Sequence, residues 1–587
     1  MRLSSYPLFR RAALSLVLPI CLGALAGVAG CSKSAPIEAG VVVEDLSPIP
    51  APEGHLADLF LPAPDATWIK ARALVGGPAA FFPQSFGALA ATTLKLPVAV
   101  AAEIDGAVPV LGAALKKGAA PAQVAVGIHV KAGGRFLDQL TKGPDARFTA
   151  KLDEASRITL LTLKSDTPGA DPGVAMGVLG NYLLVAFHAA DLTAAGPYVA
   201  RTLPSRPAPK EDLVIEMPEA ALSGPVLVEA QRSWASTRQD LDKLGAPILP
   251  VAGTVDMLLG VLADSKQARL TLDLEATAVH ARFTMTPKAG DGAASRALAD
   301  MAVGDLGPIL DLPGSSLLGM LWREPAAVRA ASIPAQADAL TKRLGPDTKA
   351  EDKEAILAAL RAENAARGDW VALGMSLDPT GPNAMVRAPL VDADRMDAAL
   401  KQLLALGKLA SVKAQLKEAA LDVTTGKTVI ENLPGDVQRV RFEQVQAKDA
   451  KSGANDAKDK PASPLPDGGI PTSIDLLYLV TKDTLFGAAG YDPKEALRSL
   501  VKAPGDASLG SNPAIKAALA GLGADASFAL VVDPLRILAA RAGKSAPAEA
   551  APVVVAIGKT AAPSVMWGRV DVAAIVVQEL VKHRGAL

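Results

Sequence analysis

The feature that most constrains the fold of this chain is a series of short apolar segments that occurs twice in the same order. Each series contains strand candidates, a helix candidate, a strand pair, a polar interruption, a hairpin followed by a helix, and a closing hairpin with its helix. Short amphipathic segments are common, but a shared order of many segments is a stronger signal than any one of them. The sequence therefore predicts an internal duplication.

Every strand or helix candidate of the first series has a counterpart in the second. An Asp precedes the helix after the first hairpin in both series, at Asp191 and at Asp492, and we expect both to be N-caps, because a side-chain oxygen there accepts hydrogen bonds from free amides. The pairs are 82–87 with 312–317, 97–105 with 370–378, 124–130 with 385–391, 134–141 with 394–416, 146–152 and 157–164 with 421–430 and 437–444, 174–187 with 474–486, 191–203 with 492–502, 213–217 with 528–532, and 270–301 with 553–582.

This order predicts an α+β fold of two related halves, each a mainly antiparallel sheet with helices packed on one face, of the split β-α-β kind. We expect the first half at 55–301 and the second at 302–587. The second half carries a charged helical insert at 335–369 that breaks at Gly345-Pro346. Its stretch 447–472 is rich in Lys, Asp, Pro and Gly, which is the composition of a disordered loop.

Charge and cysteine content exclude several classes of function. Basic and acidic residues nearly balance, with a formal net charge of −1 and no basic stripe, so a nucleic-acid partner is not expected. Cys21 and Cys31 are the two cysteines, too few for a thiolate metal site or a disulfide framework. Aromatic residues make up only 4% of the chain, so its cores must consist mainly of Ala, Leu and Val.

The first 30 residues have the three parts of an export signal, namely arginines, a long apolar run without acidic residues, and small residues at the end. The end of this segment, Val28-Ala29-Gly30-Cys31, resembles the lipobox of bacterial lipoproteins. The resemblance implies that signal peptidase II recognises Val28, Ala29 and Gly30, that residues 1–30 are removed, and that Cys31 carries lipid, palmitate included. Such an anchor with three acyl chains would hold the protein stably on a membrane.

Residues 31–54 then form the lipidated cysteine and a flexible tether of small residues and prolines. Ser32 stands where enterobacterial lipoproteins of the inner membrane have Asp, and this resemblance favours the outer membrane. We expect no second membrane span, because Asp256 and prolines interrupt the apolar segment 246–263, and acidic residues interrupt 98–115.

Sequence stretches that resemble nucleotide-binding motifs lack features that these motifs require. Gly-Lys-Ser/Thr triplets at 426–428, 543–545 and 558–560 lack the upstream glycine of a phosphate-binding loop. Residues 521–526 have the glycines of a dinucleotide fingerprint but follow a helix candidate, so they are expected to be a helix end.

The five histidines are scattered, and none has the spacing of a metal-binding pair. His129 and His280 fall on strand faces opposite the larger apolar residues, where we expect merely solvated imidazoles. The acidic pair Asp153-Glu154 lies beside a turn, where exposure to solvent explains it. We therefore expect no metal site, no cofactor and no catalytic residues.

The body of the chain resembles an uncharacterised bacterial family of duplicated α+β modules. The resemblance rests on the element 180–185 followed by Asp191, and on a repeat of it around 483–492, and it implies no known activity. We expect a lipid-anchored cell-envelope protein of non-enzymatic binding or scaffolding type, in the periplasm or at the cell surface, with the membrane and other envelope proteins as partners. Two alternatives stay open. One is a carrier of a hydrophobic ligand or lipid in a groove between the halves, which the apolar segment 247–263 favours, and the other is an envelope hydrolase.

Overall fold

The computed structural model describes the chain from Asp45 onward with several gaps. The described residues are 45–116, 122–142, 146–164, 173–243, 249–345, 348–378, 381–444, 473–502, 505, 507–523, 525–541, 550–561 and 564–582. The export signal with Val28-Ala29-Gly30-Cys31, the first part of the tether, and the loop 447–472 lie outside the described residues.

The chain divides into two compact units, each of which is described by itself. Unit 1 comprises the residues up to Ser233 together with Ser265–Ala276, and unit 2 comprises Trp234–Asp264 and Thr277–Leu587. Both units contain helices and antiparallel strands, so the fold class is α+β. The division differs from the expected boundary after residue 301, in that 234–264 and 277–301 belong to unit 2.

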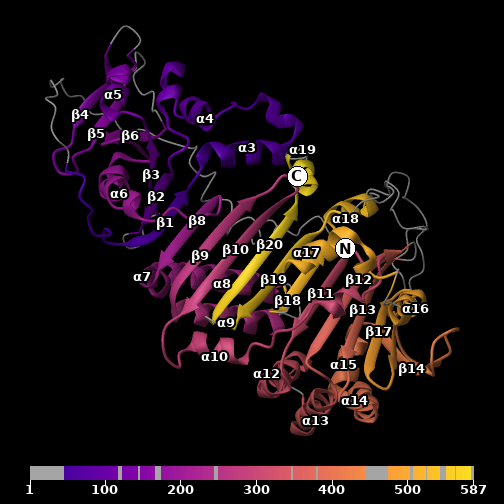
Figure 1. The fold of residues 1–587 in the computed structure, drawn as a ribbon. Coiled ribbons are helices and arrows are strands. Elements are labelled where there is room, and N and C mark those ends of the chain that lie inside the picture. The colour runs from indigo at the N-terminus through magenta and orange to yellow at the C-terminus, as the bar shows by residue number, and fades with distance from the viewer. Residues whose placement is uncertain are drawn as a thin grey trace, which may run out of the picture. The chain divides into compact units, whose positions relative to one another are not determined.

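Nine strands of unit 1 form an antiparallel sheet within the described residues (Figure 1). They are β1 (His55–Leu61), β2 (Val110–Leu115), β3 (Gln123–His129), β4 (Phe148–Leu152), β5 (Thr159–Leu163), β6 (Ala175–Leu179), β7 (Tyr182–Ala186), β8 (Leu213–Pro218) and β9 (Ser265–Leu274). Hydrogen-bonded neighbours follow the order β9-β8-β1-β2-β3-β7-β6-β5-β4. β1 is therefore an interior strand between β8 and β2.

Helices occupy the connections of unit 1. They are α3 (Pro64–Val75), η3 (Gly77–Phe81), α4 (Phe86–Thr93), η4 (Val98–Glu103), α5 (Gly133–Thr141), α6 (Ala189–Arg201), η5 (Leu203–Ser205), α7 (Glu219–Ala221), η6 (Leu222–Val226) and α8 (Leu227–Lys243), of which α8 continues into unit 2. α6 packs against β2, β3, β6 and β7, and α5 packs against β4 and β6.

These helices cover both faces of the unit 1 sheet. Leu183 and Leu184 are neighbours in β7, so their side chains point to opposite faces, and both are fully buried. Leu184 packs in the apolar cluster of Val199 from α6, whereas Leu183 packs in the cluster of Phe136 from α5. The expectation of helices on one face is therefore wrong here. A strand buried on both faces is a continuous apolar run, in which a period of two cannot be seen.

Two local predictions in unit 1 are also wrong. Residues 97–105 contain the short helix η4 instead of a strand, and the strand that pairs with β3 is β2, further along the chain. A run of Val and Ala alone does not distinguish a strand from a helix. Asp191 is not the N-cap of α6, because the helix begins at Ala189 after His188. Asp191 lies buried in the first turn, where the helix dipole favours a negative charge.

Eleven strands of unit 2 form an antiparallel sheet within the described residues. They are β10 (Ala278–Pro287), β11 (Leu318–Arg323), β12 (Trp370–Asp378), β13 (Gly381–Pro389), β14 (Leu421–Thr428), β15 (Val437–Gln444), β16 (Ser473–Val480), β17 (Thr484–Gly490), β18 (Ala526–Val532), β19 (Val553–Thr560) and β20 (Val565–Ala573). Their order is β10-β20-β19-β18-β11-β12-β13-β17-β16-β15-β14.

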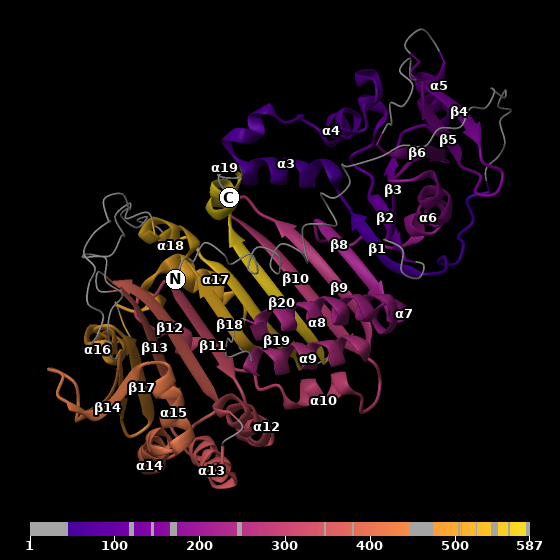
Figure 2. The ribbon, with the colours of Figure 1, turned by 180° about the vertical axis from the view of Figure 1, so that it is seen from behind.

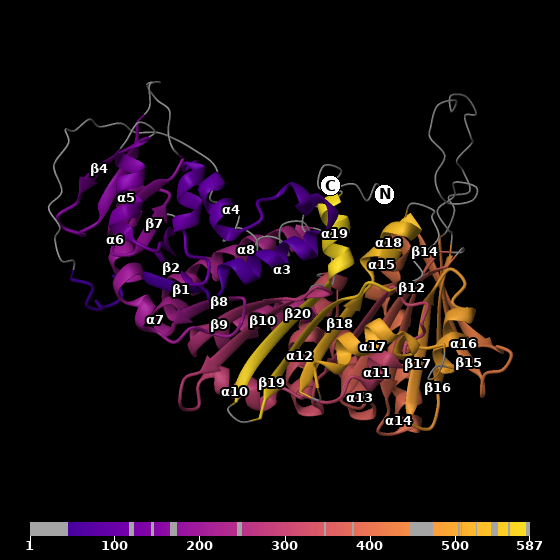
Figure 3. The same ribbon diagram turned by 45° about the horizontal axis from the view of Figure 1, so that its top comes forward.

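The helices of unit 2 are α9 (Leu249–Ala263), α10 (Ala293–Asp300), α11 (Gly307–Leu310), α12 (Ala326–Leu344), α13 (Ala350–Ala366), α14 (Ala393–Ala405), η7 (Leu406–Lys408), α15 (Ala410–Glu418), α16 (Lys494–Lys502), η8 (Leu509–Ser511), α17 (Pro513–Ala520), α18 (Pro534–Arg541) and α19 (Ala574–Lys582). The main apolar cluster brings residues of α11, α16 and α17 onto the strands (Figure 3). α9 packs against α10 and β10 (Figure 2).

The helical insert expected at 335–369 corresponds to a hairpin of α12 and α13 with a break at Gly345, but α12 begins at Ala326, before the expected start. Gly345 has φ of 98°, a conformation that glycine adopts without steric cost. The hairpin has a small apolar core of its own, formed by Ile333, Ala337, Ile356 and Leu357. It connects β11 to β12 and is a folded part of unit 2.

Candidate functional site

The most concentrated polar cluster of unit 1 surrounds Asp58, in the interior strand β1. Asp58 and Phe60 occupy alternate positions of the strand and both point inward, with 5% and 4% of their surfaces exposed. A carboxylate in such a position is stable only when hydrogen-bond donors replace the water that it loses. The surroundings of Asp58 provide three donor groups.

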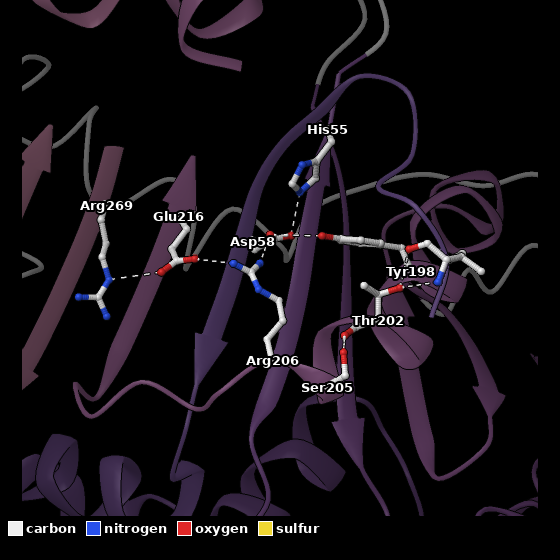
Figure 4. A network of polar contacts seen from close by, with 9 residues as sticks. His55, Asp58, Tyr198, Thr202, Ser205, Arg206, Glu216 and Arg269 are labelled. Carbon is white, nitrogen blue, oxygen red and sulfur yellow. Dashed lines mark hydrogen bonds and ion pairs between the residues drawn. The ribbon is translucent and has the colours of Figure 1, made fainter. Parts of the chain in front are cut away.

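Those donors come from three different parts of the chain (Figure 4). His55 Nε2 lies 2.7 Å from Asp58 Oδ1, while the Arg206 guanidinium, at 2.5 Å, and the Tyr198 hydroxyl, at 3.3 Å, donate to Oδ2. His55 also packs edge-to-face on Tyr198, and the Arg206 guanidinium lies over the Phe60 ring. The cluster thereby joins β1, helix α6 and the turn after η5.

A row of alternating charge extends from Asp58 across two neighbouring strands. Glu216 of β8 is directly opposite Asp58, and Arg269 of β9 is directly opposite Glu216. Two carboxylates in opposite positions repel each other, but Arg206 donates to both and lies 2.8 Å from Glu216. Arg269 lies 3.4 Å from Glu216 and forms a bidentate pair with Glu211. The row therefore ties three strands together through charge.

Two groups in this cluster have shifted pKa values, for different reasons. Burial, reinforced by the negative charge of Asp58, raises the pKa of Tyr198 to about 12, so the phenol stays a hydrogen-bond donor at neutral pH. For Glu211, burial alone would raise the pKa, but backbone hydrogen bonds and Arg269 outweigh it and hold the pKa below its usual value. Glu211 is therefore ionised in the pair with Arg269.

A shallow hollow of about 210 Å³ lies beside this row of charges. Asp58, Arg206 and Glu216 line it together with Met217, Pro218, Glu219, Lys266 and Gln267. The lining carries charges of both signs, and Arg206 already serves two carboxylates. The hollow is suited to a small polar or zwitterionic group, and the bonds of Asp58 and Arg206 mainly hold the strands in place.

A second hollow of unit 1, of about 390 Å³, lies where the chain enters the unit. Its lining combines residues from the entering segment with the turn Asn181-Tyr182 and the end of α6. Arg201 Nε donates to the main-chain oxygen of Ser47, and Thr202 Oγ1 both donates to and accepts from the main chain of Ile49. These bonds fix the entering segment on α6. The lining residues are Leu46, Pro48, His129, Asn181, Tyr182, Ala200, Arg201, Pro204 and Ser205.

The Gly-Lys-Ser/Thr triplets and the glycine-rich stretch 521–526 lie in strands or at a helix end where the structure describes them. Lys427 lies in β14 and pairs with Asp436 at 2.8 Å, and Lys559 of β19 donates to the main-chain oxygen of Leu298. The triplet 543–545 lies outside the described residues. Gly521 is the C-cap of α17, which confirms a helix end at that position.

Asp153 and Glu154 lie at the turn between β4 and β5. Ser156 donates to Asp153 through its amide and its hydroxyl, which lowers the pKa of Asp153. Glu154 pairs with Arg157 at 3.4 Å. Both carboxylates therefore have their hydrogen-bond or ion-pair partners within this turn.

The expectation that the imidazoles at 129 and 280 are merely solvated is wrong. His129 lies 3.4 Å from Asp105, and His280 lies 2.6 Å from Asp571, the residue directly opposite it on β20. Alternation within one strand does not reveal which residue lies opposite on the next strand, so sequence reasoning missed these pairs. Within the described part of the chain, no three His, Cys, Asp or Glu side chains form a group that could hold a metal ion.

Sequence reasoning also missed the cluster around Asp58. A local signal was present, because any strand over His55–Leu61 puts Asp58 on the same face as Phe60. A charged residue on the apolar face of a strand predicts a buried partner. The identity of that partner could not be predicted, since Arg206 is 148 residues away in the sequence.

The apolar segment 247–263 contains α9, whose Asp256 accepts a hydrogen bond of 3.0 Å from Trp234 Nε1 of α8. Among the helices that the structure describes, none combines the length and the apolar character needed to cross a bilayer.

Comparisons with known proteins give no relative for this chain. No protein-family model, no curated protein and no solved structure matches it.

Proposed function

We propose that this chain is a lipid-anchored, non-enzymatic protein of the cell envelope, with a body that binds or scaffolds other envelope components. The observation that carries the proposal is the segment Val28-Ala29-Gly30-Cys31 behind an arginine-led apolar run. In the mature chain Cys31 would be the N-terminal residue and the only cysteine. Ser32 favours the outer membrane.

The place where the chain enters unit 1 supports a tethered arrangement. Ser47 and Ile49 are fixed to the end of α6 by three hydrogen bonds, of 2.7 to 2.9 Å. The tether therefore ends at a defined point on the body. A tethered body acts by raising the local concentration of whatever its surface binds near the membrane.

We further propose that the two units descend from one duplicated module. The strand orders support this, because each unit has the same succession of neighbours. β9, β8, β1, β2, β3, β7, β6, β5 and β4 of unit 1 correspond in order to β19, β18, β11, β12, β13, β17, β16, β15 and β14 of unit 2. The shared order of nine strands includes crossovers, and two unrelated units rarely have the same order of this length by chance. A body of two such modules offers two related binding surfaces.

The test of the anchor is Cys31→Ser in the full chain, expressed in a bacterium with an envelope. We expect the wild type in the membrane fraction, with metabolic incorporation of labelled palmitate and a mature mass that starts at Cys31 with three acyl chains. The Cys31→Ser variant should incorporate no palmitate. It should either keep its export signal or become soluble.

The matched control is Cys21→Ser, because Cys21 lies within the signal and should be removed with it. This variant should be lipidated like the wild type. Palmitate incorporation that is unchanged in Cys31→Ser would contradict the proposal, and so would a mature protein that starts elsewhere.

A further inference from the structure

An exposed apolar patch lies where α3 is followed by η3 in unit 1. Its members are Ile69, Phe81 and Phe82, with 61%, 91% and 41% of their surfaces exposed, together with the partly buried Trp68. Phe82 lies against Trp68, with 6.2 Å between the ring centroids. We call these four residues the aromatic patch. Large apolar side chains that gather on a surface mark an interaction site.

The aromatic patch is held in place by the polar groups around it. Trp68 Nε1 donates to the main-chain oxygen of Pro83 at 2.8 Å. Arg72 donates to Gln84 Oε1 at 2.8 Å and to the main-chain oxygen of Ala79 at 3.5 Å, so it links α3 to both sides of the two phenylalanines. The patch is therefore preformed, and binding through it would cost little ordering entropy.

The charges near the aromatic patch nearly balance. Lys70 and Arg72 of α3 are basic, but Lys70 pairs with Asp212 at 2.8 Å, and α3 also carries Asp65. Asp65 accepts a hydrogen bond from the amide of Phe86 at 2.9 Å. Exposed aromatic side chains are typical of surfaces that lie in the headgroup region of a bilayer.

The length of the tether puts a bilayer within reach of the patch. Cys31 and Asp45 are 14 residues apart, and a chain of that length spans at most about 50 Å when fully extended. A compact unit of about 200 residues is about 40 Å across. The lipid on Cys31 would therefore let any face of unit 1 touch the membrane, and the chemistry of the faces would decide which one does.

We propose that the aromatic patch inserts into the headgroup region of the bilayer that holds the lipid on Cys31. This proposal rests on the proposed lipid anchor and adds a second contact to it. The lipid provides attachment, and the patch provides orientation, because two separate points of contact restrict how unit 1 turns on the membrane. The partner is thus a lipid surface.

The experiment uses single cysteines, for which this chain is well suited because the mature form would have no free thiol. Phe81→Cys and Ile69→Cys in the lipidated full chain are labelled with an environment-sensitive nitrobenzoxadiazole dye. The control is Val429→Cys, an equally apolar position with 82% of its surface exposed, at the end of β14 in unit 2. The proteins are reconstituted on vesicles of phosphatidylethanolamine with a minority of phosphatidylglycerol, with and without a nitroxide-labelled lipid.

We expect the dyes at positions 69 and 81 to shift their emission to the blue on vesicles and to be quenched several-fold more strongly by the nitroxide lipid than the dye at 429. Flotation of the vesicles reports the anchor separately. One outcome would overturn the insertion and leave the anchor intact. In it, the protein floats with the vesicles, but the dye at position 81 shows the same emission and the same quenching as the dye at position 429. A protein that does not float would overturn both. A blue shift at 81 that rises with protein concentration without vesicles would also overturn the insertion, and would show that a second copy covers the patch.

Discussion

The connection between β1 and β2 in unit 1 and the connection between β11 and β12 in unit 2 occupy the same place in two sheets of equal strand order. Both connections contain helices, but one buries its large apolar side chains and the other exposes them. α12 and α13 bury Ile333 and Leu357 against each other, and Lys353 pairs with Asp338 on their surface at 2.6 Å. The segment from α3 to η3 leaves Phe81 almost fully exposed. The architecture does not require that exposure, which is therefore a property of this sequence.

The two interior strands also differ. β1 places Asp58 at a buried position and satisfies it with Arg206, whereas β11, which pairs with the corresponding neighbours, has the apolar sequence Leu318–Arg323 with Leu321 fully buried. At this place in the strand order, unit 1 buries a charged side chain and unit 2 buries an apolar one. This comparison shows that an interior strand at this place can be packed in either way, and it can be tested by substitution.

The largest effect should come from Asp58→Ala. Removing this carboxylate leaves Arg206, His55 and Tyr198 without their shared partner, which should lower the stability of unit 1 by about 3–5 kcal/mol. Hydrogen exchange followed by mass spectrometry should show faster exchange in β1 and β8 and no change in β11 and β18. Equal acceleration in both units would contradict a role of Asp58 that is confined to unit 1.

A smaller effect is expected from Leu357→Ala, which leaves a cavity in the core of the α12–α13 hairpin and should cost about 2–4 kcal/mol. The matched variant in the other connection is Phe81→Ser, which should change stability by about 0.5 kcal/mol or less because Phe81 packs on little. Thermal unfolding of each protein without vesicles measures both. If Phe81→Ser were as destabilising as Leu357→Ala, the aromatic patch would be part of a core.

A loss of stability smaller than those of Asp58→Ala and Leu357→Ala is expected at alkaline pH. The pKa of Tyr198 is about 12 in the folded chain and 10.0 in the unfolded one, so the neutral phenol contributes stability that is fully present below pH 10 and is lost as the pH rises towards 12. Allowing for partial contact with solvent, the loss should be about 1 kcal/mol. Denaturant unfolding between pH 9 and pH 12 should show a weaker decline for Tyr198→Phe than for the wild type. Tyr491→Phe in unit 2 is the control, and an equal decline in all three proteins would contradict the assignment.

Sequence reasoning succeeded where structure is local. The hairpin at 174–187 is predicted by its apolar strands and by Gly180-Asn181, and Gly180 indeed has a positive φ of 56°. The α12–α13 hairpin is also predicted from local features, namely a charged segment and a breaking Gly-Pro. In both cases the residues that determine the structure lie next to one another in the chain.

It failed where the outcome depends on residues far away. Whether a helix covers one face of β7 or both is decided by α5 and α6 together, and Leu183-Leu184 is the same apolar pair in either case. The partners of Asp58 lie more than a hundred residues away, except for His55. The candidate site is built almost entirely from such distant contacts, so most of it could not be predicted.

The bonds between the entering segment and α6 have a mechanical consequence. A force that pulls on the body through its N-terminal tether reaches the fold at Ser47 and Ile49, and passes through Arg201 and Thr202 into α6. That helix packs on β2, β3, β6 and β7, away from the two edge strands of the sheet. A load on this segment would therefore reach four strands of the sheet through α6, in addition to β1, which follows the segment in the chain.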